Sequence, residues 1–337
     1  MHHDIKLNKI EFGDCRQTMR RWSSAGVKVN TCVTSPPYYG LRDYGHNGQI
    51  GLEESPEEYI KAMVEVFRCV WDVLADDGTL WVNIGDSYAS QGGKQVEQTV
   101  RKSDDYVNAG QMGSDGVGTT RRPPDGIKAK DLIGIPWMLA FALRADGWYL
   151  RQDIIWHKPN PMPESVKDRC TKAHEYIFLL SKSQKYYYDA DSIAEKAKPE
   201  SAERYKYTFA NATEKHAERV AGKMQNIAWN DGIRESDGKR NKRSVWTVNT
   251  KPYKGSHFAT YPPKLIEPCI LAGCPKGGVV LDPFIGSGTT AFVALLNDRQ
   301  YLGCELNPEY EELQKRRIKD AYDMTAQQSL FLVLGQD

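Results

Sequence analysis

The segment Gly278–Leu296, GVVLDPFIGSGTTAFVALL, decides the fold. It begins with an apolar, β-branched run typical of a buried strand, and after Gly288 it continues with the small and apolar residues of a helix. Between the two, Gly286 and Gly288 let the backbone approach a ligand closely, and the start of the helix favours polar or negative groups. The segment therefore predicts a strand, a tight turn and a helix that together bind a ligand.

An acidic residue, Glu305, ends the next predicted strand, 19 residues after Gly286. At this position in a βαβ unit a carboxylate can bind the hydroxyl groups of a ribose. The run from Gly286 to Ala291 also matches the dinucleotide pattern G-x-G-x-x-G/A, so a nicotinamide-dependent dehydrogenase is one alternative. The strand ends in Asp282-Pro283-Phe284, which that pattern does not require, and this counts against the dehydrogenase.

A second motif follows another predicted strand, in NTCVTSPPYYG at 30–40. Pro36 and Pro37 end the strand because neither can donate a ladder hydrogen bond and each fixes its own φ. Ser35 and Pro36 each precede a proline and are therefore held extended. The chain leaves the strand in a stiff elbow, which is either an ordinary loop or a site built on the Ser35 hydroxyl, the Pro36 carbonyl and the Tyr38 ring.

Apolar runs alternate with amphipathic stretches along the chain, which predicts an α/β protein. The predicted strands are 8–12, 30–35, 79–85, 149–157, 175–181, 278–284 and 301–306, and predicted helices are 55–78 and 135–148. Ser55 is the expected N-cap of the first helix, and Asp77-Gly78 its expected end. Residues 90–125 are rich in Gly, Ser, Asp and Thr and predict a mobile loop, while 190–245 predict a small inserted lobe.

Composition and charge limit the class of protein. The chain has 337 residues, of which 40% are hydrophobic and 26% charged, as in an ordinary globular protein. The net charge is only +1, but residues 196–255 hold 14 Lys/Arg against 7 Asp/Glu. This segment can attract a polyanion, or it can be a solvated insertion. No apolar run is long enough for a membrane span, and the N-terminus lacks a signal peptide, so we expect a cytoplasmic protein.

The seven cysteines are scattered without a CxxC pair, which predicts free thiols and no metal site. Pro268-Cys269 resembles the nucleophile of a cytosine-C5 methyltransferase, but it lies in the apolar stretch KLIEPCILAG, which favours a buried core residue. His174-Glu175 does not meet the spacing of a zinc deaminase.

The two motifs together resemble the DNA amino-methyltransferases, which use S-adenosylmethionine. TSPPY after one strand and LDPFIGSGTT after another are the paired marks of that family, and IEFGDC, HEYIFLLSKS, HFATYPPK and YLGCELNPEY are similar to its other blocks. The order of the blocks resembles the circularly permuted β group. The resemblance implies a Rossmann-like class I methyltransferase fold, with a mostly parallel seven-stranded sheet, one antiparallel strand and an inserted target-recognition lobe.

The resemblance also implies an organisation and a set of site residues. The catalytic half would be 1–189, the target-recognition insertion 190–245, the cofactor half 246–325 and the tail 326–337. Trp156 to Pro161 would form a wall beside the target base, which Ser35, Pro36, Pro37 and Tyr38 would hold. The implied cofactor residues are Asp14 on the adenine, Glu305 on the ribose, and Phe258, Thr260, Lys264, Asp282, Phe284, Gly286, Gly288 and Thr289 toward the methionine part.

The resemblance implies double-stranded DNA as the partner and a role in a restriction–modification system. It implies neither a metal nor a membrane, and it leaves a homodimer open. In the family, Ser-Pro-Pro-Tyr is associated more with N4 of cytosine than with N6 of adenine, so we expect N4 of a flipped-out cytosine as the target. N6-adenine methylation, a catalytically silent DNA-binding regulator, and a methyltransferase acting on RNA or a protein amide are the alternatives.

Overall fold

The computed structural model describes residues 5–89 without 42, 44 and 47, and residues 126–196, 239–250 and 261–334, with the backbone alone for 328–334. The chain divides into two compact units, which we describe separately. The first comprises Met1–Tyr188 and Ser244–Asp337, and the second comprises Asp189–Arg243. The expected mobile loop at 90–125 lies outside the described residues.

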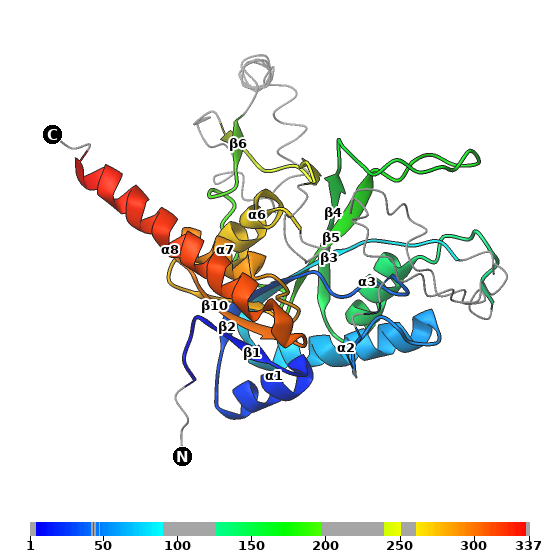
Figure 1. The fold of residues 1–337 in the computed structure, drawn as a ribbon, viewed down its shortest axis with the longest axis horizontal. Helices are drawn as coiled ribbons and strands as arrows, with labels where there is room; N and C mark the ends of the chain where they lie inside the picture. The colour runs from blue at the N-terminus through cyan, green and yellow to red at the C-terminus, as the bar shows by residue number, and fades with distance from the viewer. Residues whose placement is uncertain are drawn as a thin grey trace, which may run out of the picture. The chain divides into compact units, whose positions relative to one another are not determined.

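An eight-stranded sheet forms the centre of the first unit (Figure 1). Its strands are β1 (Lys9–Phe12), β2 (Val29–Thr34), β3 (Leu74–Ile84), β4 (Tyr149–His157), β5 (His174–Ser181), β8 (Val245–Thr247), β9 (Val279–Asp282) and β10 (Gln300–Glu305). They lie in the order β1-β10-β9-β2-β3-β5-β4-β8. Only β5 among these strands is antiparallel to its neighbours.

The α/β class and the mostly parallel sheet with one antiparallel strand are therefore confirmed, but the expected number of seven strands is wrong. The additional strand is β8, which pairs in parallel with the edge strand β4. Its three residues, Val-Trp-Thr, are too short to show an alternating pattern in the sequence. The circular permutation stays a prediction.

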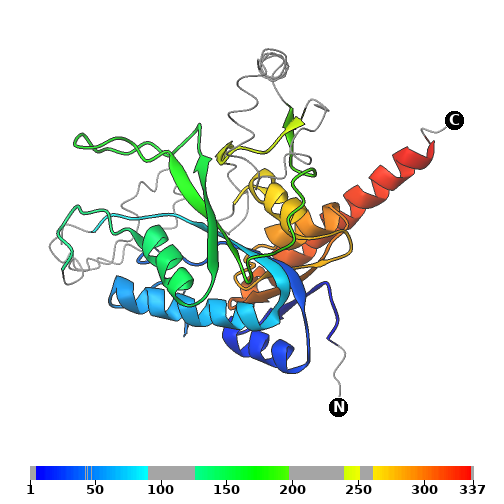
Figure 2. The same cartoon turned by 180° about the vertical axis from the view of Figure 1, so that it is seen from behind.

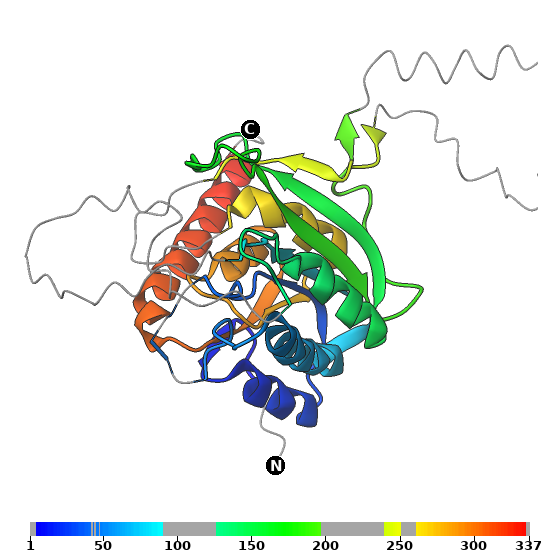
Figure 3. The ribbon, with the colours of Figure 1, turned by 90° about the vertical axis from the view of Figure 1, so that its right-hand side faces the viewer.

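Helices cover both faces of the sheet. They are α1 (Cys15–Ser24), α2 (Pro56–Val73), α3 (Ile135–Ala145), α6 (Pro263–Gly273), α7 (Thr289–Leu296) and α8 (Glu311–Leu334), and a short 3-10 helix, η2 (Pro308–Tyr310), precedes α8. α2 packs between α1 and α3, and α7 packs between α6 and α8. Because crossovers between parallel strands are right-handed, the first three helices lie on one face and the last three on the other, as Figure 3 shows. Figure 2 shows the same fold from behind the view of Figure 1.

Helix α2 begins where the sequence predicts but ends early. The Ser55 side chain accepts a hydrogen bond from the backbone N–H of Glu58 at 3.2 Å, as an N-cap does. The expected end at Asp77-Gly78 is wrong, because α2 ends at Val73 and β3 begins at Leu74.

The segment after β5 explains this early end. Lys182 Nζ donates to the Leu74 carbonyl at 3.0 Å, and the backbone N–H of Tyr187 donates to the Asp77 carbonyl at 2.8 Å. These donors come from residues more than 100 positions away and satisfy carbonyl groups that a continuing helix would have used. Tertiary contacts therefore override the local helical pattern.

The order of the strands fixes where a ligand can bind. From β9 the chain continues outward through α7 to β10, whereas from β2 it continues through α2 to β3, on the other side. The chain therefore progresses across the sheet in opposite directions from β9 and from β2. These two strands are adjacent and parallel, and they pair at Thr31 with Val280 and at Cys32 with Leu281. In open α/β sheets ligands bind beyond the carboxyl ends of the strands at this switch point. The glycine loop and the Ser-Pro-Pro-Tyr elbow follow those two ends.

The second unit contains a two-stranded antiparallel sheet, formed by β6 (Glu195–Lys196) and β7 (Lys239–Arg240). The Glu195 carboxylate lies 3.3 Å from Arg240 and 3.2 Å from Arg243, and these cations lower its pKa against the effect of burial. The unit extends from Asp189 to Arg243, whereas the expected insertion was 190–245. Its assignment to target recognition stays a prediction. In the described part of the chain, no helix has the length and hydropathy to span a bilayer.

Candidate active site

A hydrogen bond joins the two sequence motifs at the edge of the sheet. Thr34, the last residue of β2, donates from Oγ1 to Asp282 Oδ1 at 2.6 Å, and Asp282 is the last residue of β9. Ser35 follows the donor directly, and the glycine loop follows the acceptor. Residues 248 positions apart in the chain are thus in contact, and the elbow and the glycine loop lie beside each other.

The Asp282 carboxylate anchors the glycine loop from within. It is 1% exposed, and besides Thr34 it accepts from the backbone N–H of Phe284 at 3.0 Å, from Thr290 Oγ1 at 2.5 Å and from Tyr261 Oη at 3.0 Å. Burial raises its pKa, and the four hydrogen bonds oppose that rise. These donors come from β2, the loop itself, α7 and the segment before α6, so this carboxylate holds four parts of the site together.

The glycine loop adopts a conformation that requires glycine. Gly286 has φ of 52° and Gly288 has φ of 84°, in the left-handed region that L-residues rarely adopt. The N–H of Gly286 donates to Glu305 Oε2 at 2.8 Å, and its carbonyl accepts from Gln314 Nε2 at 2.6 Å. Arg317, also on α8, donates to Ser287 Oγ at 3.0 Å and to the Thr289 hydroxyl. The loop is therefore held in one shape by β10 and α8 before any ligand binds.

Glu305 and Asp14 extend the same edge of the sheet. Phe12 of β1 pairs with Glu305 of β10, and the N–H of Gly13 donates to the Glu305 carbonyl at 2.8 Å. Burial raises the pKa of the Glu305 carboxyl, although backbone N–H donors from Asn307 and Gly286 oppose the rise. The Asp14 side chain caps α1 by accepting from the backbone N–H of Arg16 at 2.8 Å. Burial raises the Asp14 pKa, but hydrogen bonds and charge from Arg16 outweigh it, so the net shift is downward.

The Ser-Pro-Pro-Tyr elbow is packed and hydrogen-bonded. Pro36 is buried, Ser35, Pro37 and Tyr38 are half-buried, and the Pro37 carbonyl accepts from the Tyr59 hydroxyl at 2.8 Å. The Tyr38 hydroxyl donates to Glu175 Oε2 at 2.7 Å. Burial and the Glu175 charge raise the Tyr38 pKa well above its usual value, so the phenol stays protonated.

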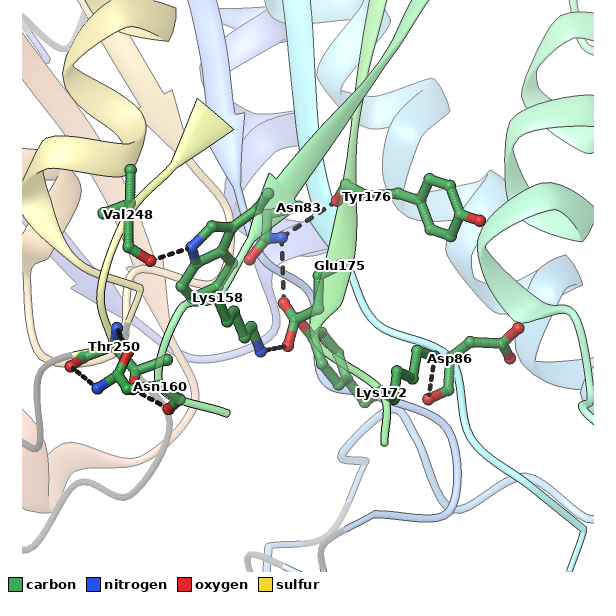
Figure 4. A network of polar contacts seen from close by, with 11 residues as sticks. Asn83, Asp86, Lys158, Asn160, Lys172, Glu175, Tyr176, Val248 and Thr250 are labelled. Atoms are coloured by element: carbon green, nitrogen blue, oxygen red, sulfur yellow. Dashed lines mark hydrogen bonds and ion pairs between the residues drawn. The ribbon is translucent and has the colours of Figure 1, made fainter. Parts of the chain in front are cut away.

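Figure 4 shows the polar network around Glu175. Its carboxylate accepts from Asn83 Nδ2 at 3.2 Å and is paired with the Lys158 ammonium group. Lys172 lies at the side of this network and donates from Nζ to the Asp86 carbonyl at 2.9 Å. Burial lowers the pKa of Lys172. The network joins the ends of β3, β4 and β5 to the elbow after β2.

The wall expected at Trp156 to Pro161 is held by backbone contacts. Trp156 donates from Nε1 to the Val248 carbonyl at 2.8 Å, and the side chain of Asn160 accepts from the N–H of Thr250 at 3.0 Å (Figure 4). Lys158 lies over the Trp156 ring at 4.4 Å from its centroid.

The structure brings most of the expected site residues to one edge of the sheet. These are Asp14, Ser35, Pro36, Pro37, Tyr38, Asp282, Phe284, Gly286, Gly288, Thr289 and Glu305, which all lie at or just beyond the carboxyl ends of β1, β2, β9 and β10. Lys264 is exposed on the first turn of α6. Phe258 and Thr260 lie outside the described residues.

Cys269 is a core residue and not a nucleophile, as its helical context predicted. It is 1% exposed within α6. Among the described residues, no group of three or more His, Cys, Asp or Glu side chains could hold a metal ion.

Several residues that hold the motif side chains in place were not predicted in that role from the sequence. Thr34, Tyr261 and Thr290 donate to Asp282, and Gln314 supports the loop. Glu175 accepts from the Tyr38 hydroxyl and is itself held by Asn83 and Lys158. Three of them lie within recognised blocks, Thr34 in TSPPY, Thr290 in LDPFIGSGTT and Tyr261 in HFATYPPK, and this position was the available signal. Lys158 lies within the expected wall from Trp156 to Pro161 and Glu175 within HEYIFLLSKS, but nothing in the sequence indicated that Glu175 meets Tyr38, because only strand pairing brings them together.

Curated relatives align with nearly the whole chain. The Type II methyltransferase M.SmaI of Serratia marcescens is 47% identical over 321 residues, which cover 94% of this chain and 93% of the relative. The Type II methyltransferase M.Cfr9I of Citrobacter freundii is 46% identical over 307 residues, covering 91% and 86%.

Solved structures share the fold at low identity. The cytosine-N4-specific PvuII DNA methyltransferase superposes with a TM-score of 0.56 at 16% identity, covering 96% of this chain and 94% of that one. The M1.HpyAVI complex with S-adenosylmethionine superposes with a TM-score of 0.52 at 16% identity, covering 92% and 98%. The family model described as DNA methylase, of N6 and N4 methyltransferases, matches residues 29–316. The protein is therefore a member of the S-adenosylmethionine-dependent DNA methylase family, as its two motifs indicated.

Proposed function

We propose that this protein transfers the methyl group of S-adenosylmethionine to the exocyclic N4 of a flipped-out cytosine in double-stranded DNA. The observation that carries the proposal is the Thr34–Asp282 hydrogen bond, because it holds the elbow and the glycine loop side by side. A target amine at the first and a methyl donor at the second would then face each other in one site. The names of the relatives support a role in a type II restriction–modification system.

The chemistry of the candidate cofactor residues suits S-adenosylmethionine. The glycine loop is held by Asp282, Glu305 and Gln314, and the carboxylates of Glu305 and Asp14 are acceptors of the kind that hydroxyl and amino groups require. We assign the ribose to Glu305, the adenine to Asp14 and the methionine part to the loop from Asp282 to Thr289. The sulfonium of this cofactor supplies an activated methyl group.

The elbow is suited to activate an exocyclic amine. The lone pair of such an amine is delocalised into the ring, so the nitrogen is a poor nucleophile. The Ser35 hydroxyl and the Pro36 carbonyl would each accept one amino hydrogen, which draws the nitrogen toward sp³ and restores its lone pair. Nitrogen then forms the bond to the methyl carbon as the carbon–sulfur bond breaks, and the product amine releases one proton. Orientation and exclusion of water supply most of the rate.

Tyr38 offers its ring as a platform for the flipped base. Stacking on an aromatic ring contributes about 1–3 kcal/mol per base. Extrusion of a base from the duplex costs on the order of a few kcal/mol. Stacking on Tyr38 would therefore offset a substantial part of the cost of flipping.

Cytosine N4 is favoured over adenine N6 by the serine at position 35, since the family associates Asp or Asn at this place with adenine. Incubation with DNA and S-adenosylmethionine labelled in the methyl group, followed by digestion to nucleosides, tests the assignment. We expect the label in N4-methylcytosine. Label in N6-methyladenine would establish the alternative, and absence of transfer to varied DNA would favour a DNA-binding regulator. Competition between duplex DNA and RNA as substrates distinguishes a DNA methyltransferase from one that acts on RNA.

We further propose that the unit Asp189–Arg243 recognises the target sequence. It contains the larger part of the basic segment 196–255, whose excess of Lys and Arg suits phosphate contacts.

A further inference from the structure

We propose that Glu175 is a positioning residue, which fixes the Tyr38 ring for the target base and is itself held by Lys158 and Asn83. This inference rests on the proposed function, in which Tyr38 is the platform for the base. It assigns to Glu175 a role that neither the motifs nor the comparisons give it. Glu175 acts through the Tyr38 hydroxyl and does not touch the base.

The contact between Glu175 and Tyr38 is short and sheltered from water. The Tyr38 hydroxyl donates to Glu175 Oε2 at 2.7 Å, and the Glu175 side chain is 15% exposed. Hydrogen bonds to a charged acceptor are about twice as strong as neutral ones. One end of the Tyr38 ring is therefore fixed by this bond, while the backbone of the elbow fixes the other end.

The carboxylate is itself prevented from turning away. Lys158 pairs with its Oε1, and Asn83 donates to its Oε2 at 3.2 Å while also donating to the Tyr176 carbonyl at 3.1 Å. Figure 4 shows these groups converging on Glu175 from β3 and from the residue after β4. Lys158 is 17% exposed, lies over the Trp156 ring and is paired with Glu175, so its ammonium group is itself held in place.

Gly85 leaves the space in which the ring lies. A Cβ atom at this position would stand 2.8 Å from Tyr38 Cε2 and 3.4 Å from the Glu175 carboxyl carbon. Atoms at the shorter distance overlap, so any other residue would displace the ring. The end of β3 is thus shaped around the Tyr38–Glu175 pair.

Two substitutions of Glu175 separate its contact with Tyr38 from its charge. Glu175→Gln and Glu175→Leu both remove the ion pair with Lys158, and both change stability for that reason. Only the glutamine keeps a side-chain oxygen that can accept from the Tyr38 hydroxyl. The difference between the two variants therefore contains the contacts with Tyr38 and Asn83, and its change in a Tyr38→Phe background reports on the contact with Tyr38.

Single-turnover methylation of DNA by the full chain, together with the Kd for S-adenosylmethionine, provides the test. In the Tyr38 background we expect the leucine variant to be about fivefold slower than the glutamine variant, the equivalent of one lost hydrogen bond. In a Tyr38→Phe background the two should agree within about twofold, because the phenylalanine has no hydroxyl to hold. The Kd for the cofactor should be the same in all variants.

A rate difference that persists in the Tyr38→Phe background would overturn the inference, as would equal rates of the two variants in the Tyr38 background. A parallel loss of cofactor affinity would also overturn it, since Glu175 would then support the whole site. Failure of the proposed function has a different appearance, because the unchanged protein would then transfer no methyl group to DNA.

Discussion

The Glu305 carboxyl combines two properties that make cofactor binding depend on pH. Its charged form accepts from the Gly286 N–H, and we assign the cofactor ribose to it, yet burial raises its pKa. The ordinary pKa of a glutamate is 4.5, so on acidification the Glu305 carboxylate is protonated at a higher pH than an ordinary glutamate. We expect the affinity for S-adenosylmethionine to fall as the pH is lowered toward that raised pKa, measured by calorimetry from pH 7.5 downward.

Protonation of Glu305 should weaken cofactor binding without unfolding the protein. A raised carboxyl pKa means that the folded state binds the proton more tightly than the unfolded state, so this group adds stability as the pH falls. Glu305→Gln should bind the cofactor more weakly at pH 7.5 and show a flatter pH profile. An unchanged profile in this variant would assign the pH dependence to another group.

Tyr38 is expected to act on the base and not on the cofactor. Tyr38→Ala removes the platform, worth about 1–3 kcal/mol per stacked base, which corresponds to a loss of about 5- to 150-fold in turnover. The Kd for S-adenosylmethionine should stay nearly unchanged, because the glycine loop is held by Asp282, Glu305 and Gln314. Methyl-transfer assays and calorimetry on the same preparation check this. Equal losses in both quantities would count against the assigned role.

At the level of elements, one hydroxyl joins the ends of β2 and β9 in addition to their backbone pairing. Thr34→Val keeps the shape of the side chain but removes a donor from the buried Asp282 carboxylate. We expect a loss of about 1–3 kcal/mol in the free energy of unfolding, measured in urea, and a weaker affinity for the cofactor because the loop is less firmly held.

The same strand offers a matched control. Thr31 of β2 is also buried, and its hydroxyl contacts the Thr79 hydroxyl at 2.8 Å, away from the ligand edge. Thr31→Val should lower stability without changing the affinity for the cofactor. If both variants weakened cofactor binding equally, the effect would come from general destabilisation and not from the Thr34–Asp282 contact.

On the scale of the whole molecule, the two compact units predict a separation of functions. Replacement of Asp189–Arg243 by a short Gly/Ser linker should leave the eight-stranded sheet folded, since its strands all lie in the other unit. We expect cofactor binding within about threefold of the intact chain, because the residues assigned to the cofactor all lie in the other unit and compact units can fold alone. Methylation of DNA should be lost, and circular dichroism confirms that the remainder is folded. Retained sequence-specific methylation would contradict the assignment of this unit to recognition.

The parts of the fold that could be predicted depend on local rules. The strand before Asp282, the glycine turn and the Ser55 cap follow from β-branched runs, positive φ and side-chain capping, and each involves only neighbours in the chain. The early end of α2 and the strand β8 could not be predicted, because both depend on partners far along the chain. Lys182 and Tyr187 take the carbonyl groups after Val73, and β4 supplies the pairing for β8.

The sequence by itself determined the chemistry of this protein: a glycine loop with Glu305 beyond it, an elbow carrying Ser35 and Tyr38, and hence the family. These are properties of short segments, and short segments determine which groups are available. The tertiary structure decided how those groups are held, since Thr34 reaches Asp282 only when β2 lies beside β9. Likewise, Glu175 reaches Tyr38 only because β5 runs antiparallel to β3. A hydrogen bond requires its partners within about 3 Å, and between distant residues only the pairing of strands provides that proximity.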